Sequence, residues 1–166
     1  NYQFVAARLL LYGNQKQVFN TKWKDSEIYP PLYDIIERNI AKKVYDPAIL
    51  DMYTKEEIEQ CDKYIKHSRD ITFTYAGLQQ IVDKYLVQDR SNGEVFETPQ
   101  FMYMLIAMTL FHKYDEDRRL DYVKKYYDAI STYKINIPTP IMAGVRTPIR
   151  QFASCVLVDS DDTLDS

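Results

Sequence analysis

The chain has 166 residues, which suits one domain of ordinary size or a domain and part of another. Its hydrophobic content of 46% and charged content of 27% are ordinary for a globular protein that buries a real core. The net charge of −3 argues against a basic nucleic-acid-binding protein, and no apolar run is long enough to predict a membrane span.

The first predicted element is a helix within residues 2–19, where apolar residues recur at close to helical spacing. Gly13-Asn14 is expected to break or end this helix. Residues 20–29 are polar and irregular. The only tryptophan, Trp23, lies there and is interpreted as a lid on neighbouring helices.

Three helices are expected next, and each has a recognisable start. Pro30-Pro31 opens the first, because proline suits the first helical turn. Asp46-Pro47 begins the second, with aspartate as the cap. Thr54 and Glu57 have the spacing of a capping box, which opens a helix to about Lys66. The apolar face of the first of these helices consists of Leu32, Ile35, Ile36, Ile40 and Val44.

A hairpin between two helices is expected in the middle of the chain. Residues 74–85 form the first helix. The turn signal Asn92-Gly93 lies between short apolar pairs, which predicts a hairpin at about 85–96. Thr98-Pro99 then caps a helix that is apolar almost all round and should be the most buried of the domain.

The last helix of this region is amphipathic and runs from its cap at Asp115 to about Lys134. Its inward-facing residues are expected to be Leu120, Val123, Tyr127 and Ile130. Residues 1–135 are therefore interpreted as an α-helical region with a small hairpin. By themselves they indicate no function.

Few side chains of this region are candidates for chemistry. His67 and His112 have no cysteine or carboxylate at ligand spacing, so no metal site is predicted. Cys61 is interpreted as a small buried hydrophobic residue, and the 15 tyrosines as core residues with the hydroxyl at the surface. Two distant cysteines form no disulfide scaffold, and the start lacks a signal-peptide pattern, so a cytoplasmic setting is expected.

Binding chemistry is concentrated in Ile137–Asp159. Pro138-Thr139-Pro140 fixes a hydroxyl between two rigid residues, which suits a hydrogen bond to a phosphate or sugar oxygen; a loop that is merely stiffened remains the alternative. Gly144 allows a ligand or another chain to approach the backbone closely. Arg146 and Arg150 either bind phosphate or are surface charges.

An apolar strand is expected at Cys155-Val156-Leu157-Val158, so the stretch is interpreted as a stiff loop that delivers a strand. Cys155 is either inert core or functional. The following run, Asp159 to Thr163, caps a helix that starts near Leu164. Such a helix start is either plain capping or a site for a ribose hydroxyl or base edge.

The run STYKINIPTPIMAGVRTPIRQFASCVLVDSDDTLDS closely resembles the large (alpha) subunit of class I ribonucleoside-diphosphate reductases of bacterial or phage type. HSRDITFTYAGLQQIVDKYLVQ and RRLDYVKKYYDAIS resemble the N-terminal helical region of that family, and NYQFVAARL resembles the end of its ATP-cone. The chain is therefore expected to be an N-terminal fragment. The resemblance implies ATP-cone residues at 1–20, the helical domain at 21–135, and the start of the reductase barrel at 136–166.

The fold that the resemblance implies is mainly α: a helical N-terminal domain with a small β-hairpin leads into the first strand of a ten-stranded α/β barrel. It also implies residue roles. Cys155 matches one of two redox-active cysteines, whose partner lies beyond residue 166. Thr139 and Ser154 match residues that hold the substrate diphosphate and sugar, and Lys16 matches an ATP-contacting lysine. Three residues match the effector-binding start of the dimer-interface helix: Asp162, Thr163 and Leu164.

The implied activity is reduction of ribonucleoside diphosphates to 2′-deoxyribonucleoside diphosphates by radical chemistry, for DNA synthesis. ATP and deoxynucleotides are the implied effectors, and a di-iron or di-manganese radical cofactor is expected on a separate small (beta) subunit. Further implied partners are a second alpha subunit and thioredoxin or glutaredoxin, with no nucleic acid and no membrane. The fragment alone is expected to be inactive. The alternative is a non-catalytic helical interaction module in which Cys155 is inert.

Overall fold

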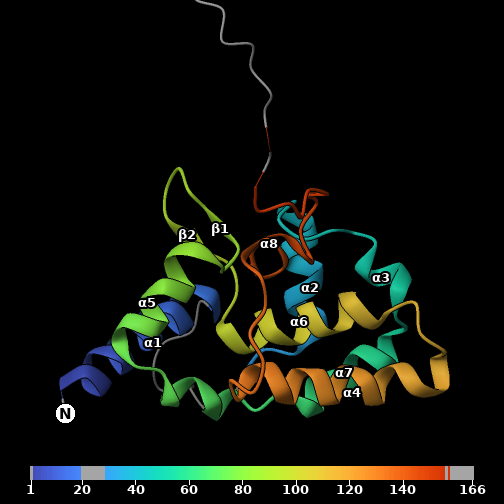
Figure 1. Cartoon of the computed structure of the whole chain (residues 1–166), viewed down its shortest axis with the longest axis horizontal. Helices are drawn as coiled ribbons and strands as arrows, with labels where there is room; N and C mark the ends of the chain where they lie inside the picture. Colours follow the sequence, from blue (N-terminus) through green and yellow to red (C-terminus); the bar gives the residue numbers. More distant parts are fainter. Residues whose placement is uncertain (1, 20–28, 156, 158–166) are drawn as a thin grey trace, which may run out of the picture.

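The computed structural model of the chain describes residues 2–19, 29–155 and 157. These residues form helices that pack around one central helix, with a two-stranded antiparallel sheet at one end (Figure 1). The expected mainly helical fold with a small hairpin is confirmed. No helix within the described ranges is both long enough and apolar enough to span a bilayer.

The central helix is α6 (Pro99–Phe111), and every residue from Pro99 to Met108 is buried. A helix that is apolar on all sides requires neighbours on all sides, and α6 has them. The amphipathic helix α7 (Glu116–Ser131) packs along it, with Val123, Tyr127 and Ile130 buried. The burial of α6 and the inward face of α7 are confirmed, with Leu120 only partly buried. The side chains of Thr98 and Asp115 form no capping hydrogen bond, and α7 ends at Ser131 rather than near Lys134.

Helix α1 (Tyr2–Phe19) continues through Gly13-Asn14, so the expected break is wrong. The reason is a tertiary contact: the Asn14 side chain is buried, and its Nδ2 donates a hydrogen bond to the backbone carbonyl of Glu97 at 3.1 Å. Leu11 and Val18 join the same core. Burial on this face outweighs the low helix propensity of glycine and asparagine.

The expected starts of α2 (Leu32–Ala41) and α4 (Lys55–Tyr64) are confirmed. The helix between them, α3 (Ile49–Met52), begins after Ala48 rather than at Asp46-Pro47 and is only one turn long. Pro31 caps α2, and the Asp46 carboxylate accepts a hydrogen bond from the backbone N–H of Ala48 at 3.0 Å before α3. Both hydrogen bonds of the Thr54–Glu57 capping box are present. The elements of this region are α2 (Leu32–Ala41), α3 (Ile49–Met52), α4 (Lys55–Tyr64) and the 3-10 helix η2 (His67–Thr72).

Helix α5 (Tyr75–Lys84) packs against α1 and leads into the hairpin of β1 (Gln88–Asp89) and β2 (Glu94–Val95). The hairpin is confirmed, but residues 90–93 form a four-residue connection rather than a two-residue turn. Gly93 has a φ of 75°, a left-handed conformation that glycine adopts without strain.

The segment expected to be a stiff loop contains a short helix, α8 (Thr139–Gly144), so that expectation is wrong in part. Pro138 caps this helix, and its carbonyl accepts hydrogen bonds from the backbone N–H groups of Ile141 and Met142 at 3.0 and 3.1 Å. Pro140 lies in the first turn, where a missing N–H costs nothing.

The expected strand at residues 155–158 stays a prediction. Residues 151–155 and Leu157 are in no helix or strand, while Val156 and Val158 lie outside the described residues. Trp23 also lies outside them, as do the proposed effector contacts Asp162, Thr163 and Leu164.

Candidate functional site

An open groove of about 510 Å³ brings together two of the predicted site residues, Thr139 and Ser154. One wall is α8 and the other is the segment that follows it. No charged side chain lines the groove within the described residues, so its polar groups are hydroxyls, amides and backbone atoms. Its full lining consists of Thr139, Pro140, Ala143, Gly144, Ile149, Gln151, Ala153 and Ser154.

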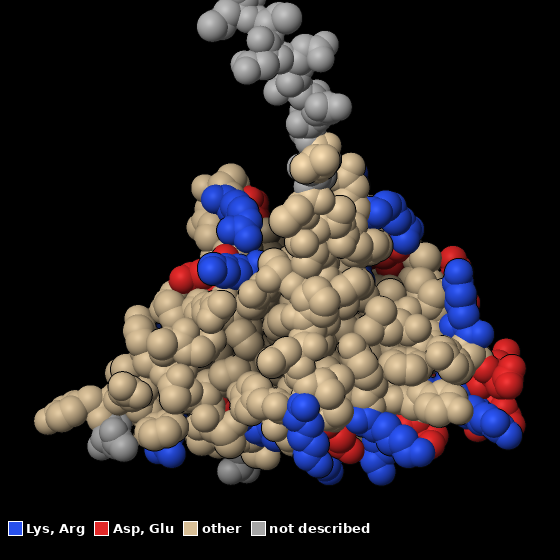
Figure 2. Space-filling view, in the orientation of Figure 1, with Lys and Arg blue, Asp and Glu red and all other residues tan. Residues whose placement is uncertain are grey.

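The groove lies where the chain crosses back over α8. Figure 1 shows α8 beneath the C-terminal segment, and Figure 2 shows that the centre of this face carries few charged side chains. A Cβ atom at Gly144 would lie only 3.2 Å from Cε1 of Phe152, so the glycine lets the Phe152 ring pack against α8 without being displaced. The close approach predicted at Gly144 is therefore made by the chain's own Phe152.

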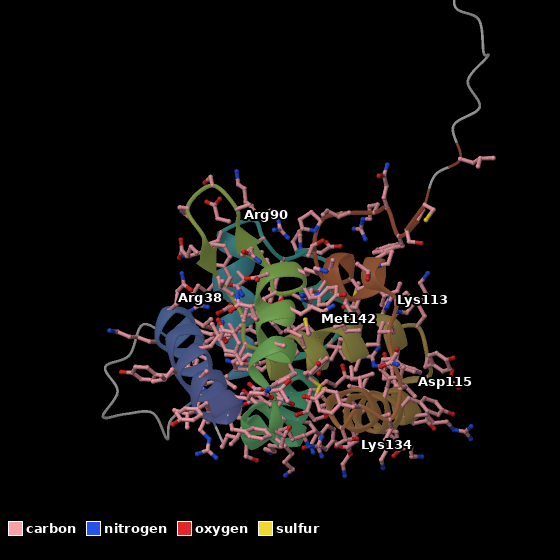
Figure 3. All side chains as sticks on the ribbon, turned by 60° about the vertical axis from the view of Figure 1, so that its left-hand side comes forward. Arg38, Arg90, Lys113, Asp115, Lys134 and Met142 are labelled. Atoms are coloured by element: carbon pink, nitrogen blue, oxygen red, sulfur yellow. The ribbon has the colours of Figure 1, made fainter. Side chains whose placement is uncertain are left out.

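The Thr139 hydroxyl has a neighbour from another helix. Its Oγ1 lies 3.3 Å from the hydroxyl oxygen of Tyr85, the residue that follows α5, and either group can be the donor. Figure 3 labels Met142 where α8 approaches α5. Two elements far apart in sequence thus meet beside the groove, at Thr139.

Arg146, two residues after α8, is fully buried, so both predicted roles, phosphate ligand and surface charge, are wrong. Its guanidinium forms an ion pair with the equally buried carboxylate of Glu97. Arg146 Nε donates to both carboxylate oxygens, at 3.1 and 3.0 Å. Tyr45 donates its hydroxyl to Glu97 Oε2 at 2.5 Å, and the backbone N–H of Val87 donates to Oε1 at 2.9 Å.

The same guanidinium joins α8 to α5. Arg146 Nη1 donates to the carbonyls of Met142 and Val145 at 2.6 and 2.9 Å, which satisfies the C-terminal end of α8. Arg146 Nη2 donates to the carbonyl of Tyr85 at 2.9 Å. One side chain therefore fixes the end of α8 and the residue whose hydroxyl contacts Thr139.

Charge and burial act in opposite directions at this ion pair. Burial alone lowers the pKa of Arg146, but the adjacent Glu97 carboxylate outweighs it and the net shift is upward, so the guanidinium stays charged. Burial and the same carboxylate raise the pKa of Tyr45, which stays a neutral donor. Arg146 also has a φ of 80°, a left-handed conformation that costs a non-glycine residue roughly 1–2 kcal/mol.

Arg150 is a surface charge, which was one of its two predicted roles. Its side chain is 72% exposed, and its Nη2 lies 2.6 Å from Oδ2 of Asp46. Exposed ion pairs of this kind contribute little to stability.

The two cysteines have opposite environments. Cys61 is buried on α4, as predicted, and burial raises the pKa of its thiol to about 12. Cys155 is a free, exposed thiol that directly follows Ser154 at the rim of the groove. Cys155 itself does not line the groove among the described residues, so the structure places it next to the groove in the chain but does not direct its thiol into it.

A second pocket, of about 470 Å³, lies between α1 and η2. Lys16 is exposed near the end of α1 but does not line this pocket, and its ATP contact stays a prediction. His67 lines the pocket and stacks on Tyr29 with ring centroids 3.8 Å apart. Burial lowers the pKa of His67 to about 4, so the ring is neutral at pH 7. The described residues contain no group of three or more His, Cys, Asp or Glu side chains placed to bind a metal ion.

Sequence reasoning missed Tyr85 and Glu97. One signal was available for Glu97: it is the single charge in the otherwise uncharged run VFETPQFMYMLIA, and a charge inside such a run is buried and needs a buried partner. No comparable signal marks Tyr85 among 15 tyrosines.

Comparison with known proteins gives consistent matches along the chain. The family model described as "Ribonucleotide reductase, all-alpha domain" matches residues 71–150. Over its full length, the chain is 50% identical to the ribonucleoside-diphosphate reductase subunit alpha of Haemophilus influenzae. It is 48% identical to the corresponding subunit of Escherichia coli and 45% identical to that of Enterobacteria phage T4. In each case the chain spans 21% of the relative's length.

Proposed function

The chain belongs to the family of ribonucleoside-diphosphate reductase alpha subunits, as the N-terminal part of one, and from this premise we propose that it supplies one wall of a reductase active site. The proposed reaction reduces a ribonucleoside diphosphate to the 2′-deoxyribonucleoside diphosphate. The observation that carries the proposal is that Thr139 and Ser154 line one groove with Cys155 next to it in the chain. Since no charged side chain lines the described part of the groove, its contacts to the diphosphate are hydrogen bonds from hydroxyl, amide and backbone groups.

Each residue has a distinct proposed role. The hydroxyls of Thr139 and Ser154 donate hydrogen bonds to diphosphate or sugar oxygens. The Cys155 thiol and a second thiol beyond residue 166 together give up two electrons and two protons and become a disulfide. The substrate gains a hydrogen at C2′ in place of its hydroxyl, which leaves as water. Thioredoxin or glutaredoxin restores the two thiols by disulfide exchange.

The remaining parts of the proposal concern what lies around this wall. In the whole enzyme, the segment from Cys155 to Val158 would form the first strand of a ten-stranded α/β barrel, and residues 1–20 would be the end of an ATP-cone with Lys16 at its ATP site. A specificity effector binds at the segment Asp162–Leu164 in an alpha dimer. A separate beta subunit with a di-iron or di-manganese centre supplies the radical, and the enzyme acts in the cytoplasm.

A chimeric enzyme tests the proposal. The 167 aligned residues of the Haemophilus influenzae subunit are replaced by this chain, and the chimera is combined with that organism's beta subunit. We expect thioredoxin-dependent turnover of cytidine diphosphate, which Cys155→Ser abolishes and the buried control Cys61→Ser preserves. A chimera that is folded by circular dichroism but makes no deoxycytidine diphosphate would contradict the proposal. So would multiple turnover by the Cys155→Ser variant, which would favour the alternative of an inert interaction module.

A further inference from the structure

We propose that Tyr85 is a positioning residue for phosphate binding, which acts by orienting the Thr139 hydroxyl toward the groove. The inference rests on the proposed function of that groove. Its structural basis is the 3.3 Å separation between the Tyr85 hydroxyl oxygen and Thr139 Oγ1. Tyr85 does not line the groove itself, so it acts through Thr139.

The direction of this hydrogen bond decides what Thr139 can do. A threonine hydroxyl has one proton and two lone pairs, and a phosphate oxygen only accepts hydrogen bonds. When Tyr85 donates to Thr139 Oγ1, the single threonine proton is free to be donated to the phosphate. A phenol is also a better donor than an aliphatic hydroxyl, so a bound phosphate selects this arrangement.

Two backbone hydrogen bonds fix the position of Tyr85. Its backbone N–H donates to the carbonyl of Ile81 at 3.0 Å, and its own carbonyl accepts from Arg146 Nη2 at 2.9 Å. Since Arg146 also holds the carbonyls of Met142 and Val145 at the end of α8, one buried guanidinium sets the separation of α5 and α8. The Tyr85–Thr139 pair therefore joins two elements whose relative position Arg146 already fixes.

The test is a titration of the isotopically labelled chain with inorganic pyrophosphate, followed by NMR at Thr139 and Ser154. We expect saturable shifts at both residues. Tyr85→Phe should weaken binding roughly two- to tenfold, the range that follows from losing one hydrogen bond. The matched control is Tyr75→Phe, which removes an exposed hydroxyl from the other end of α5 and should leave binding unchanged.

Two further readouts separate positioning from a general structural role. Tyr85→Phe should have no additional effect in a Thr139→Val background, because the tyrosine acts only through that hydroxyl. It should also broaden the χ1 rotamer distribution of Thr139, seen in three-bond couplings, while the thermal midpoint stays unchanged. Equal binding by Tyr85→Phe and wild type would overturn the inference, as would additive effects of the two substitutions.

The outcomes also separate this inference from the proposed function. If Thr139→Val and Ser154→Ala weaken pyrophosphate binding while Tyr85→Phe does not, the groove stands as a phosphate site and only the role of Tyr85 is wrong. If pyrophosphate shifts neither Thr139 nor Ser154 in the wild-type chain, the phosphate site and the role of Tyr85 are both wrong.

Discussion

Replacing Arg146 by methionine should strongly destabilise the fold. The substitution leaves the Glu97 carboxylate buried with only two donors, the Tyr45 hydroxyl and the Val87 N–H. Three carbonyls also lose their donor: those of Tyr85, Met142 and Val145. Breaking a buried ion pair by removing one partner typically costs about 3–5 kcal/mol. For a chain of this size, each kcal/mol lowers the thermal midpoint by roughly 2–4 °C, so we expect a fall of about 6–20 °C.

The assay is urea unfolding at pH 7 followed by far-ultraviolet circular dichroism, with the thermal midpoint measured in parallel. Methionine at this position has the same left-handed backbone to adopt as arginine, so the comparison isolates the side chain. Arg150→Met is the matched control: it breaks an ion pair whose arginine is 72% exposed and should cost at most about 1 kcal/mol. An Arg146→Met variant within about 1 kcal/mol of wild type would refute the assignment of Arg146 as the link between α5 and α8.

Four other predictions concern individual side chains. Burial raises the pKa of Asp70 to about 7, so the native state holds a proton that the unfolded chain releases near pH 4. The free energy of unfolding should therefore fall by up to ~4 kcal/mol between pH 4 and 7. Asp70→Asn should remove this part of the dependence of the urea midpoint on pH, and an unchanged pH dependence would contradict the assignment. Thr54→Ala should cost ~1 kcal/mol by removing the cap of α4. In contrast, Thr98→Val should leave stability unchanged or raise it by up to ~1 kcal/mol, because its buried hydroxyl has no partner among the described residues; a marked loss on urea unfolding would show a missed contact. Iodoacetamide at pH 8 should label exposed Cys155 and leave buried Cys61 unmodified by mass spectrometry, and equal labelling would disprove the burial of Cys61.

Local signals predicted the elements that depend on local chemistry. The Thr54–Glu57 capping box, the hairpin around Asn92-Gly93 and the fully apolar α6 all formed where the sequence placed them. In each case the residues that set the structure are close neighbours in the chain. Thr139 and Ser154 lie farther apart, and only the family resemblance predicted that they share a site; the groove is consistent with it.

The errors occurred where a partner distant in sequence decides the outcome. Asn14 stays helical because it bonds to Glu97, 83 residues away, and Arg146 is buried because it pairs with the same residue, 49 positions away. Hydrophobic periodicity carries no information on such pairings, and an arginine in a polar loop is usually exposed. Glu97 is the partner in both cases, through its backbone carbonyl for Asn14 and its carboxylate for Arg146, so recognising its buried charge would have corrected the Arg146 assignment.

The central claim is that Cys155 is a redox-active thiol at a substrate site. Its most direct test is disulfide mapping of the Haemophilus influenzae chimera after a single turnover with cytidine diphosphate and no external reductant. Mass spectrometry should find Cys155 joined to a cysteine of the Haemophilus influenzae portion, in proportion to the deoxycytidine diphosphate formed, with Cys61 still a free thiol. Product formation that leaves Cys155 fully reduced would contradict the claim.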